Sequence, residues 1–190
     1  MKAIIEANLN EAKEVLDDFV SHSDNINSIE RSARILIESI EKGGKIISCG
    51  NGGSMTDAMH FAEELSGVFR EKRPALPAIS ISDPSHITCT ANDYGFDSVF
   101  SRFVEGVGQR GDVLLAITTS GNSMNIIKAA EAAKDKGMKV VGLTGKSGGL
   151  LSGMVDSEIR VKGRTHSDRI QEVHIKVLHI LVLLMEEGLS

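Results

Sequence analysis

Apolar side chains recur three or four residues apart over two stretches at the start of the chain. Residues 3–20 and 26–42 each show this spacing, which is typical of amphipathic helices. Polar residues 21–27 separate the two stretches, and Gly43 and Gly44 end the second. The pattern predicts a pair of N-terminal helices. Their apolar faces can pack on the chain's own sheet or on a second subunit.

From residue 44 onward, short apolar runs alternate with helical patterns, interrupted by a predicted turn at residues 92–95. Strands are predicted at 45–49, 78–82, 112–117, 139–144 and 157–161, and helices at about 53–65, 84–90, 97–108, 124–136 and 167–187. Alternation of this kind predicts an α/β fold with a five-stranded parallel sheet in the flavodoxin-like order 2-1-3-4-5 and helices on both faces. We expect a single domain over residues 1–190, with a helical pair (1–43) and an α/β core (44–190).

Two glycine-containing loops follow the first and third predicted strands. The first contains Asn51, Gly52 and Gly53, and the second runs over residues 118–123. In the order 2-1-3-4-5 both loops flank the point where the strand order reverses, where open α/β sheets bind ligands. We therefore expect the two loops to face each other across one site.

The second loop places hydroxyls at the start of a helix, on Thr118, Thr119, Ser120 and Ser123. A helix N-terminus attracts anions, so these side chains suit a phosphate group. A Ser/Thr-rich cap and turn is the alternative interpretation. The P-loop lysine and the GxGxxG fingerprint are both missing, so no nucleotide cofactor is expected.

Two histidines carry the remaining chemical signal. His60 and Glu64 are four residues apart and share the side of their helix that faces away from its packing stripe. Such a pair can bind a metal, pass protons or be a solvated surface pair. The last helix is apolar almost all round from 175 to 185, except for Lys176 and His179, which predicts burial in a core or between subunits. His179 can be functional or can simply bond a backbone carbonyl.

Composition excludes several classes of function. The net charge is −5 and no long basic cluster occurs, so binding to nucleic acid is not expected. Apolar runs are too short for a membrane span. The N-terminus lacks signal-peptide character, and two cysteines cannot form a disulfide framework. We expect a cytoplasmic protein.

The motifs CGNGGS, DAMHFAEEL, NDYGF, TSGNS, LTGKSGG and DRIQEVHIKVLHI occur in an order and spacing that resemble the sugar isomerase (SIS) family. Within it, the chain is most similar to the phosphoheptose isomerases. The resemblance implies an aldose–ketose isomerase that converts sedoheptulose 7-phosphate to D-glycero-D-manno-heptose 7-phosphate through an enediol, for surface polysaccharide. It also implies a homotetramer with its sites between subunits.

The same resemblance implies a role for individual residues. Glu64 and His179 would be the acid–base pair. The substrate would contact Asn51, Gly52, Gly53, Glu64, Asn92, Asp93 and Gln171, and its phosphate would contact Thr118, Thr119, Ser120 and Ser123. Zinc would bind to His60, Glu64, Gln171 and His179. The chain departs from related sequences at Met55, where His or Ala is frequent, and at Thr118, where Ser is common; threonine keeps the hydroxyl.

Three other interpretations compete with this one. Non-catalytic SIS proteins that bind the replication initiator share the loops but lack the acidic residue and the histidine, both present here as Glu64 and His179. An isomerase for another sugar phosphate would share the phosphate loop. A sugar-phosphate sensor would need a partner domain.

Overall fold

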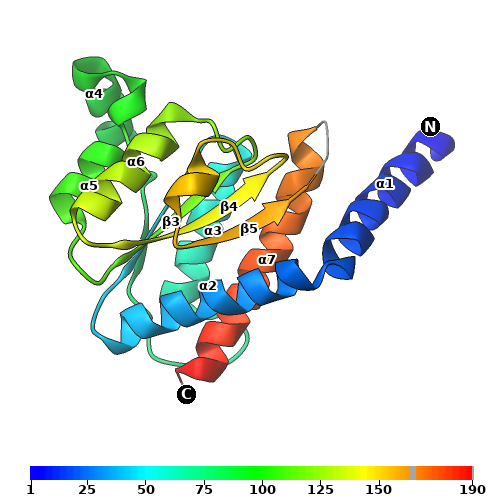
Figure 1. Cartoon of the computed structure of the whole chain (residues 1–190), viewed down its shortest axis with the longest axis horizontal. Coiled ribbons are helices and arrows are strands. Elements are labelled where there is room, and N and C mark those ends of the chain that lie inside the picture. The colour runs from blue at the N-terminus through cyan, green and yellow to red at the C-terminus, as the bar shows by residue number, and fades with distance from the viewer. Residues whose placement is uncertain (163–165, 190) are drawn as a thin grey trace.

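The computed structural model describes residues 1–162 and 166–189 and shows alternating helices and strands after an N-terminal helical pair (Figure 1). The helices are α1 (Lys2–Ser21), α2 (Ser23–Glu41), α3 (Gly53–Ser66), α4 (Pro84–Tyr94), α5 (Ser101–Val107), α6 (Met124–Asp135) and α7 (Ser167–Gly188). Short 3₁₀ turns are η1 (Phe96–Ser98) and η2 (Leu151–Met154). The strands are β1 (Ile46–Gly50), β2 (Ala78–Ser80), β3 (Val113–Thr118), β4 (Lys139–Gly145) and β5 (Ser157–Val161).

The five strands form one sheet in the order β2-β1-β3-β4-β5, and every neighbouring pair is parallel. The predicted fold class and strand order are therefore confirmed. Ile47 of β1 pairs with Ile79 of β2 on one side and Leu114 of β3 on the other. This register brings the carboxyl ends of β1 and β3 to the same edge, together with the two loops that follow them.

Helices cover both faces of the sheet (Figure 1). Residues of α2, α3 and α7 share a core with Val113, Leu115 and Ile117 of β3, whereas α5 and α6 share a second core with Leu114 and Ala116. Successive side chains of β3 therefore enter opposite cores, and all of its residues are buried, as expected for a parallel sheet covered on both faces.

Helix α1 extends away from the rest of the molecule (Figure 1). Only Val15 and Phe19, near its C-terminal end, are buried. Ile4, Ile5 and Leu9 are 67%, 57% and 67% exposed. The apolar stripe predicted for this helix is thus largely uncovered within a single chain.

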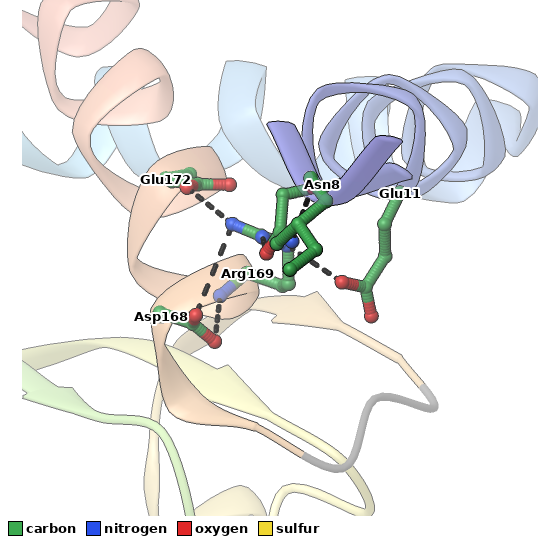
Figure 2. A network of polar contacts seen from close by, with 6 residues as sticks. Asn8, Glu11, Asp168, Arg169 and Glu172 are labelled. Atoms are coloured by element: carbon green, nitrogen blue, oxygen red, sulfur yellow. Dashed lines mark hydrogen bonds and ion pairs between the residues drawn. The ribbon is translucent and has the colours of Figure 1, made fainter. Parts of the chain in front are cut away.

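One buried cation attaches this helix to the start of α7 (Figure 2). Arg169 donates hydrogen bonds to Glu11 Oε2 (3.0 Å) and Asn8 Oδ1 (2.7 Å) of α1, and to Glu172 Oε1 (2.6 Å) of its own helix. Its side chain is 8% exposed, so these partners offset the cost of burying the charge.

The predicted polar break over residues 21–27 is wrong, because His22 alone separates α1 from α2. A polar side chain of this segment bonds a backbone carbonyl at the end of α1, and the segment does not form a loop. Asn25 donates from Nδ2 to the carbonyl oxygen of Phe19 (2.7 Å), which is one of the carbonyls that the end of α1 leaves without a partner in the helix.

The predicted turn at residues 92–95 is also wrong over most of its length. Helix α4 continues through Asn92 and Asp93 to Tyr94, and only Gly95, with a φ of 83°, ends it. The positive φ is the conformation that glycine adopts readily, so the stop signal lies in Gly95 alone. Among the residues described, no helix combines the length and the hydropathy needed to cross a bilayer.

Candidate active site

Helices α3 and α6 both begin at the carboxyl edge of the sheet, on either side of a hollow of about 300 Å³. The hollow is lined by Asn51, Gly52, Gly53, Ser54, Ile117, Thr118, Thr119, Ser120, Ser123, Ser167 and Gln171. Both predicted loops therefore face one another across a single site.

Hydroxyl groups converge on one side of this hollow. Thr118 Oγ1 lies 3.4 Å from Ser120 Oγ and 3.3 Å from Ser123 Oγ, at the N-terminus of α6. Thr119 donates from Oγ1 to Ser167 Oγ at 3.2 Å. Hydroxyl donors at the positive end of a helix dipole form a suitable site for a phosphate group.

Gln171, in the second turn of α7, closes the hollow against the first loop. Its side chain lies so near Gly53 that a Cβ atom there would come within 2.6 Å of Gln171 Nε2. Gly52 has a φ of 54°, a left-handed conformation that glycine adopts at little cost. The loop therefore requires both glycines, one for its turn and one for the contact with Gln171.

Asn125 and Ser167 belong to this site but were not found from the sequence. Asn125, buried in the first turn of α6, donates from Nδ2 to Asn51 Oδ1 at 2.8 Å and accepts from Asn51 Nδ2 at 2.9 Å. Its position directly after the hydroxyl loop was the available signal. Ser167 is distant in sequence from the loops, and no local pattern marks it.

A second group of polar side chains, which we call the His60 group, joins α3 to α7 and consists of His60, Glu64 and His179. His60 Nε2 lies 3.0 Å from His179 Nε2 and 3.3 Å from Glu64 Oε1. One ligand atom from each of His60, Glu64 and His179 lies within 4.8 Å of the other two, an arrangement that can hold a metal ion. The structure thus brings together Glu64 and His179 from separate helices. Gln171, the other predicted ligand, lines the hollow described above.

Asp57 lies one turn before His60 and is half-buried. Burial raises the pKa of its carboxyl group to about 6, although the nearby His60 opposes the shift. Its Oδ2 atom is buried and makes no hydrogen bond within the described part of the chain. A carboxyl group in this condition favours its protonated form more than an exposed one does.

His174 lies in the core between α7 and the sheet. It is fully buried, and its Nε2 atom lies 2.9 Å from the carbonyl oxygen of Thr144. Burial lowers the pKa of the imidazole to about 4. His174 is therefore neutral at pH 7 and has no contact with the His60 group.

Asn92 and Asp93 do not reach the hollow of their own chain. Both are exposed on the last turn of α4, where Asn92 Nδ2 donates to Asp93 Oδ1 at 2.7 Å. They are absent from the residues that line the hollow. If they contact substrate, a second subunit must place them there.

Comparisons with known proteins agree with this geometry. A family model described as a SIS domain matches residues 9–145. A phosphoheptose isomerase of Yersinia enterocolitica is 60% identical over 184 residues, which cover 97% of this chain and 95% of that protein. The structure of a phosphoheptose isomerase from Francisella tularensis has a TM-score of 0.92 and 36% identity, and covers 97% of each chain. That of the enzyme from Neisseria gonorrhoeae has a TM-score of 0.91 and 35% identity, and covers 98% of each.

The chain belongs to the phosphoheptose isomerases of the SIS family. This confirms the resemblance stated from the motifs, including the expectation of an isomerase. The interpretation as a non-catalytic SIS protein loses its support, because relatives at this level of identity over nearly the whole chain are named as isomerases.

Proposed function

We propose that the protein converts sedoheptulose 7-phosphate to D-glycero-D-manno-heptose 7-phosphate. The observation that carries the proposal is the approach of Glu64 and His179 from α3 and α7, the same two helices that contribute Gly53 and Gln171 to the hollow lined by hydroxyls. The names of the relatives support the choice of a heptose phosphate. The hollow would bind the phosphate at the start of α6, and Asn51 and Gln171 would contact the sugar.

Isomerisation moves one proton between C1 and C2 and shifts another between the oxygens on those carbons. We assign Glu64 as the base that removes the proton from C1 of the ketose and returns it to C2. His179 acts at the oxygens, donating to the developing enediolate at O2 and accepting the proton from O1. A carboxylate and an imidazole divide this chemistry in triosephosphate isomerase. Each well-placed group contributes roughly 10²–10⁴-fold.

The His60 group also suits zinc. Two imidazoles and one carboxylate are an ordinary zinc donor set, and the 3.0 Å between the two Nε2 atoms is near the separation of two nitrogens bound to one ion at about 2.0–2.1 Å each. We propose His60, Glu64 and His179 as ligands, with Gln171 as a weaker fourth. Because a carboxylate bound to zinc is a poorer base than a free one, Glu64 would have to leave the metal during turnover. When bound, the metal would polarise the substrate carbonyl and stabilise the enediolate.

We further propose a cytoplasmic homotetramer with shared sites. Three features support shared sites: the uncovered apolar residues of α1, the 42% exposure of Ile180 on α7, and the placement of Asn92 and Asp93 away from their own hollow. Both cysteines are free thiols, which suits a reducing compartment.

One experiment tests the assignment. Sedoheptulose 7-phosphate is incubated with the wild type and with Glu64→Gln in deuterated water, and the aldose is followed by NMR together with deuterium incorporation at C2. We expect the wild type to produce aldose and Glu64→Gln to bind the substrate without turnover. Glu41→Gln is the control, because Glu41 is an exposed glutamate at the end of α2, away from the His60 group. Turnover by Glu64→Gln at the wild-type rate would refute the assignment. Failure of the wild type to act on this heptose, with activity on another sugar phosphate, would refute the substrate.

A further inference from the structure

Arg73 lies in the connection between α3 and β2, outside the site, yet it contacts both helices that carry the reacting groups. It donates from Nη2 to the backbone carbonyl of Glu64 (2.7 Å) and from Nη1 to that of Leu65 (2.7 Å). Its Nε atom donates to Glu186 Oε1 of α7 at 2.8 Å. We propose that Arg73 is a positioning residue that fixes the carboxylate of Glu64 relative to the imidazole of His179. This rests on the proposed roles of those two residues.

The contacts with α3 occur where that helix needs a partner. The last carbonyls of a helix have no N–H donor within it, and the helix dipole places partial negative charge there. Glu64 and Leu65 are in the final turn of α3, which ends at Ser66. The guanidinium group satisfies the carbonyl of Glu64, shares that of Leu65 with the N–H of Leu76 (2.9 Å) and complements the dipole, so it holds in place the backbone that carries the Glu64 side chain.

The contact with α7 is an ion pair removed from water. The side chains of Arg73 and Glu186 are 13% and 12% exposed, and Glu186 lies about two turns after His179 on the same helix. Such pairs often contribute little net stability compared with apolar residues of the same volume, because both charges lose their hydration. Such a pair is better explained by the arrangement that it fixes than by the stability that it adds. Here the ion pair fixes the position of α7 relative to α3.

The connection between α3 and β2 also contacts the imidazole of His179. The ring of Phe69 packs on the ring of His179 with centroids 5.6 Å apart, and Phe69 joins the core beneath α3 and α7. Phe69 and Arg73 therefore hold this connection against both helices. Catalysis depends steeply on such placement, because a displacement of about 1 Å can cost on the order of 10²-fold in rate.

Lysine cannot replace arginine in this role. The planar guanidinium presents five N–H donors in a fixed fork, whereas the ammonium of lysine is a point charge on a flexible stem. Arg73→Lys keeps the charge beside Glu186 but cannot hold Glu186 and the two carbonyls in the same geometry. This variant therefore separates the effect of the fork from that of the charge.

The test compares kcat, KM and Tm for Arg73→Lys, Glu186→Gln and a control, Lys45→Met. Lys45 forms a partly buried ion pair with Asp112 at the opposite edge of the sheet, at 2.5 Å. We expect Arg73→Lys to lower kcat at least about tenfold, in proportion to a displacement of the carboxylate. KM should change by less than about twofold, because Arg73 does not line the hollow. Lys45→Met should lower Tm but leave kcat unchanged.

Two results would overturn the proposal. One is an unchanged kcat in Arg73→Lys; the other is a loss of kcat that Lys45→Met reproduces at equal loss of Tm, which would make the role merely structural. If Arg73→Lys does not fold, Glu186→Gln decides by the same criteria. Turnover by Glu64→Gln would instead refute the catalytic assignment itself, so the two failures are distinguishable.

Discussion

The side-chain amides of Asn51 and Asn125 exchange two hydrogen bonds, of 2.9 and 2.8 Å, between the loop before α3 and the first turn of α6. The pair spans the point where the strand order reverses and links the two sides of the hollow. Asn125 is 2% exposed, so neither water nor another side chain can easily replace its partner. The loop that would contact the sugar and the helix that would bind the phosphate are thus held in register.

Replacing Asn125 with leucine removes both bonds and leaves the Asn51 amide without its partner. Because Asn51 is only half-buried and lines the hollow, the loss should stay at the lower end of the roughly 1–3 kcal/mol that an unsatisfied buried polar group costs, and it should loosen the first loop. We expect KM for the sugar phosphate to rise roughly tenfold with a smaller change in kcat, since Glu64 and His179 lie elsewhere. Steady-state kinetics measures both. A lower kcat at constant KM would contradict this role for the pair.

Thr119→Val tests the phosphate site with a change of nearly equal volume. The substitution removes the hydroxyl that donates to Ser167 and lines the hollow. A hydrogen bond to a charged group is worth about 1.5–3 kcal/mol, so KM should rise roughly 10- to 100-fold. Inhibition by inorganic phosphate should weaken in parallel. If phosphate inhibits the variant as strongly as the wild type, the anion binds elsewhere.

Metal removal tests the His60 group independently of activity. Dialysis against a chelator should lower Tm, and zinc should restore it, because a ligand that binds only the folded state stabilises it by about 2.7 kcal/mol at 100 times its Kd. His60→Gln should abolish the response to zinc, whereas His22→Gln, at an exposed histidine between α1 and α2, should keep it. An equal zinc response in His60→Gln would place the metal at another site.

Burial of His174 should make the folded protein less stable in acid. Its pKa is lowered from 6.5 to about 4 in the folded state, so the unfolded chain takes up a proton on this residue over that range and the folded chain does not. The contribution of His174 to the free energy of unfolding is fully present above pH 6.5. It falls by about 3 kcal/mol as the pH decreases to 4.

The comparison that isolates this effect is wild type against His174→Gln, in which the glutamine amide can still donate to Thr144. Taking the difference between the two Tm–pH curves cancels the opposite contribution of Asp57, whose raised pKa costs stability as the pH rises toward 6. Between pH 6.5 and 4 the wild type should lose more stability than the variant. Parallel curves would mean that His174 does not titrate as its burial requires.

Local patterns predicted the sheet order and the meeting of the two loops, because strand–helix alternation leaves few topologies for a parallel sheet. The spacing of His60 and Glu64 was equally visible. Asn125, Ser167 and Arg73 were not found, because each acts through a partner that is distant in sequence. In the sequence, Arg73 is one of several charged residues between the predicted helix 53–65 and the predicted strand 78–82, and its contact with Glu186 depends on how α7 packs against α3.

The two errors in secondary structure have a common cause. Asn, Asp and Ser favour caps and turns because their side chains bond nearby backbone groups. The Asn25 side chain bonds the carbonyl of Phe19 and so links α1 to α2 across His22. The Asn92 side chain bonds the carboxylate of Asp93 within a helix that continues to Tyr94. The residue type indicated side-chain bonding to a helix end or neighbour; it did not indicate where the helix stops.

The two cysteines differ completely in accessibility. Cys49 is buried in β1, and burial raises the pKa of its thiol to about 12, whereas Cys89 is exposed on α4 with its Sγ atom 3.5 Å from Asp93 Oδ2. A maleimide dye will therefore label the native protein at one position, slowly, since the adjacent Asp93 raises the pKa of the Cys89 thiol as well. The unaltered chain thus carries its own attachment point for a fluorescent reporter, one helical turn from a residue expected to meet the substrate in a neighbouring subunit.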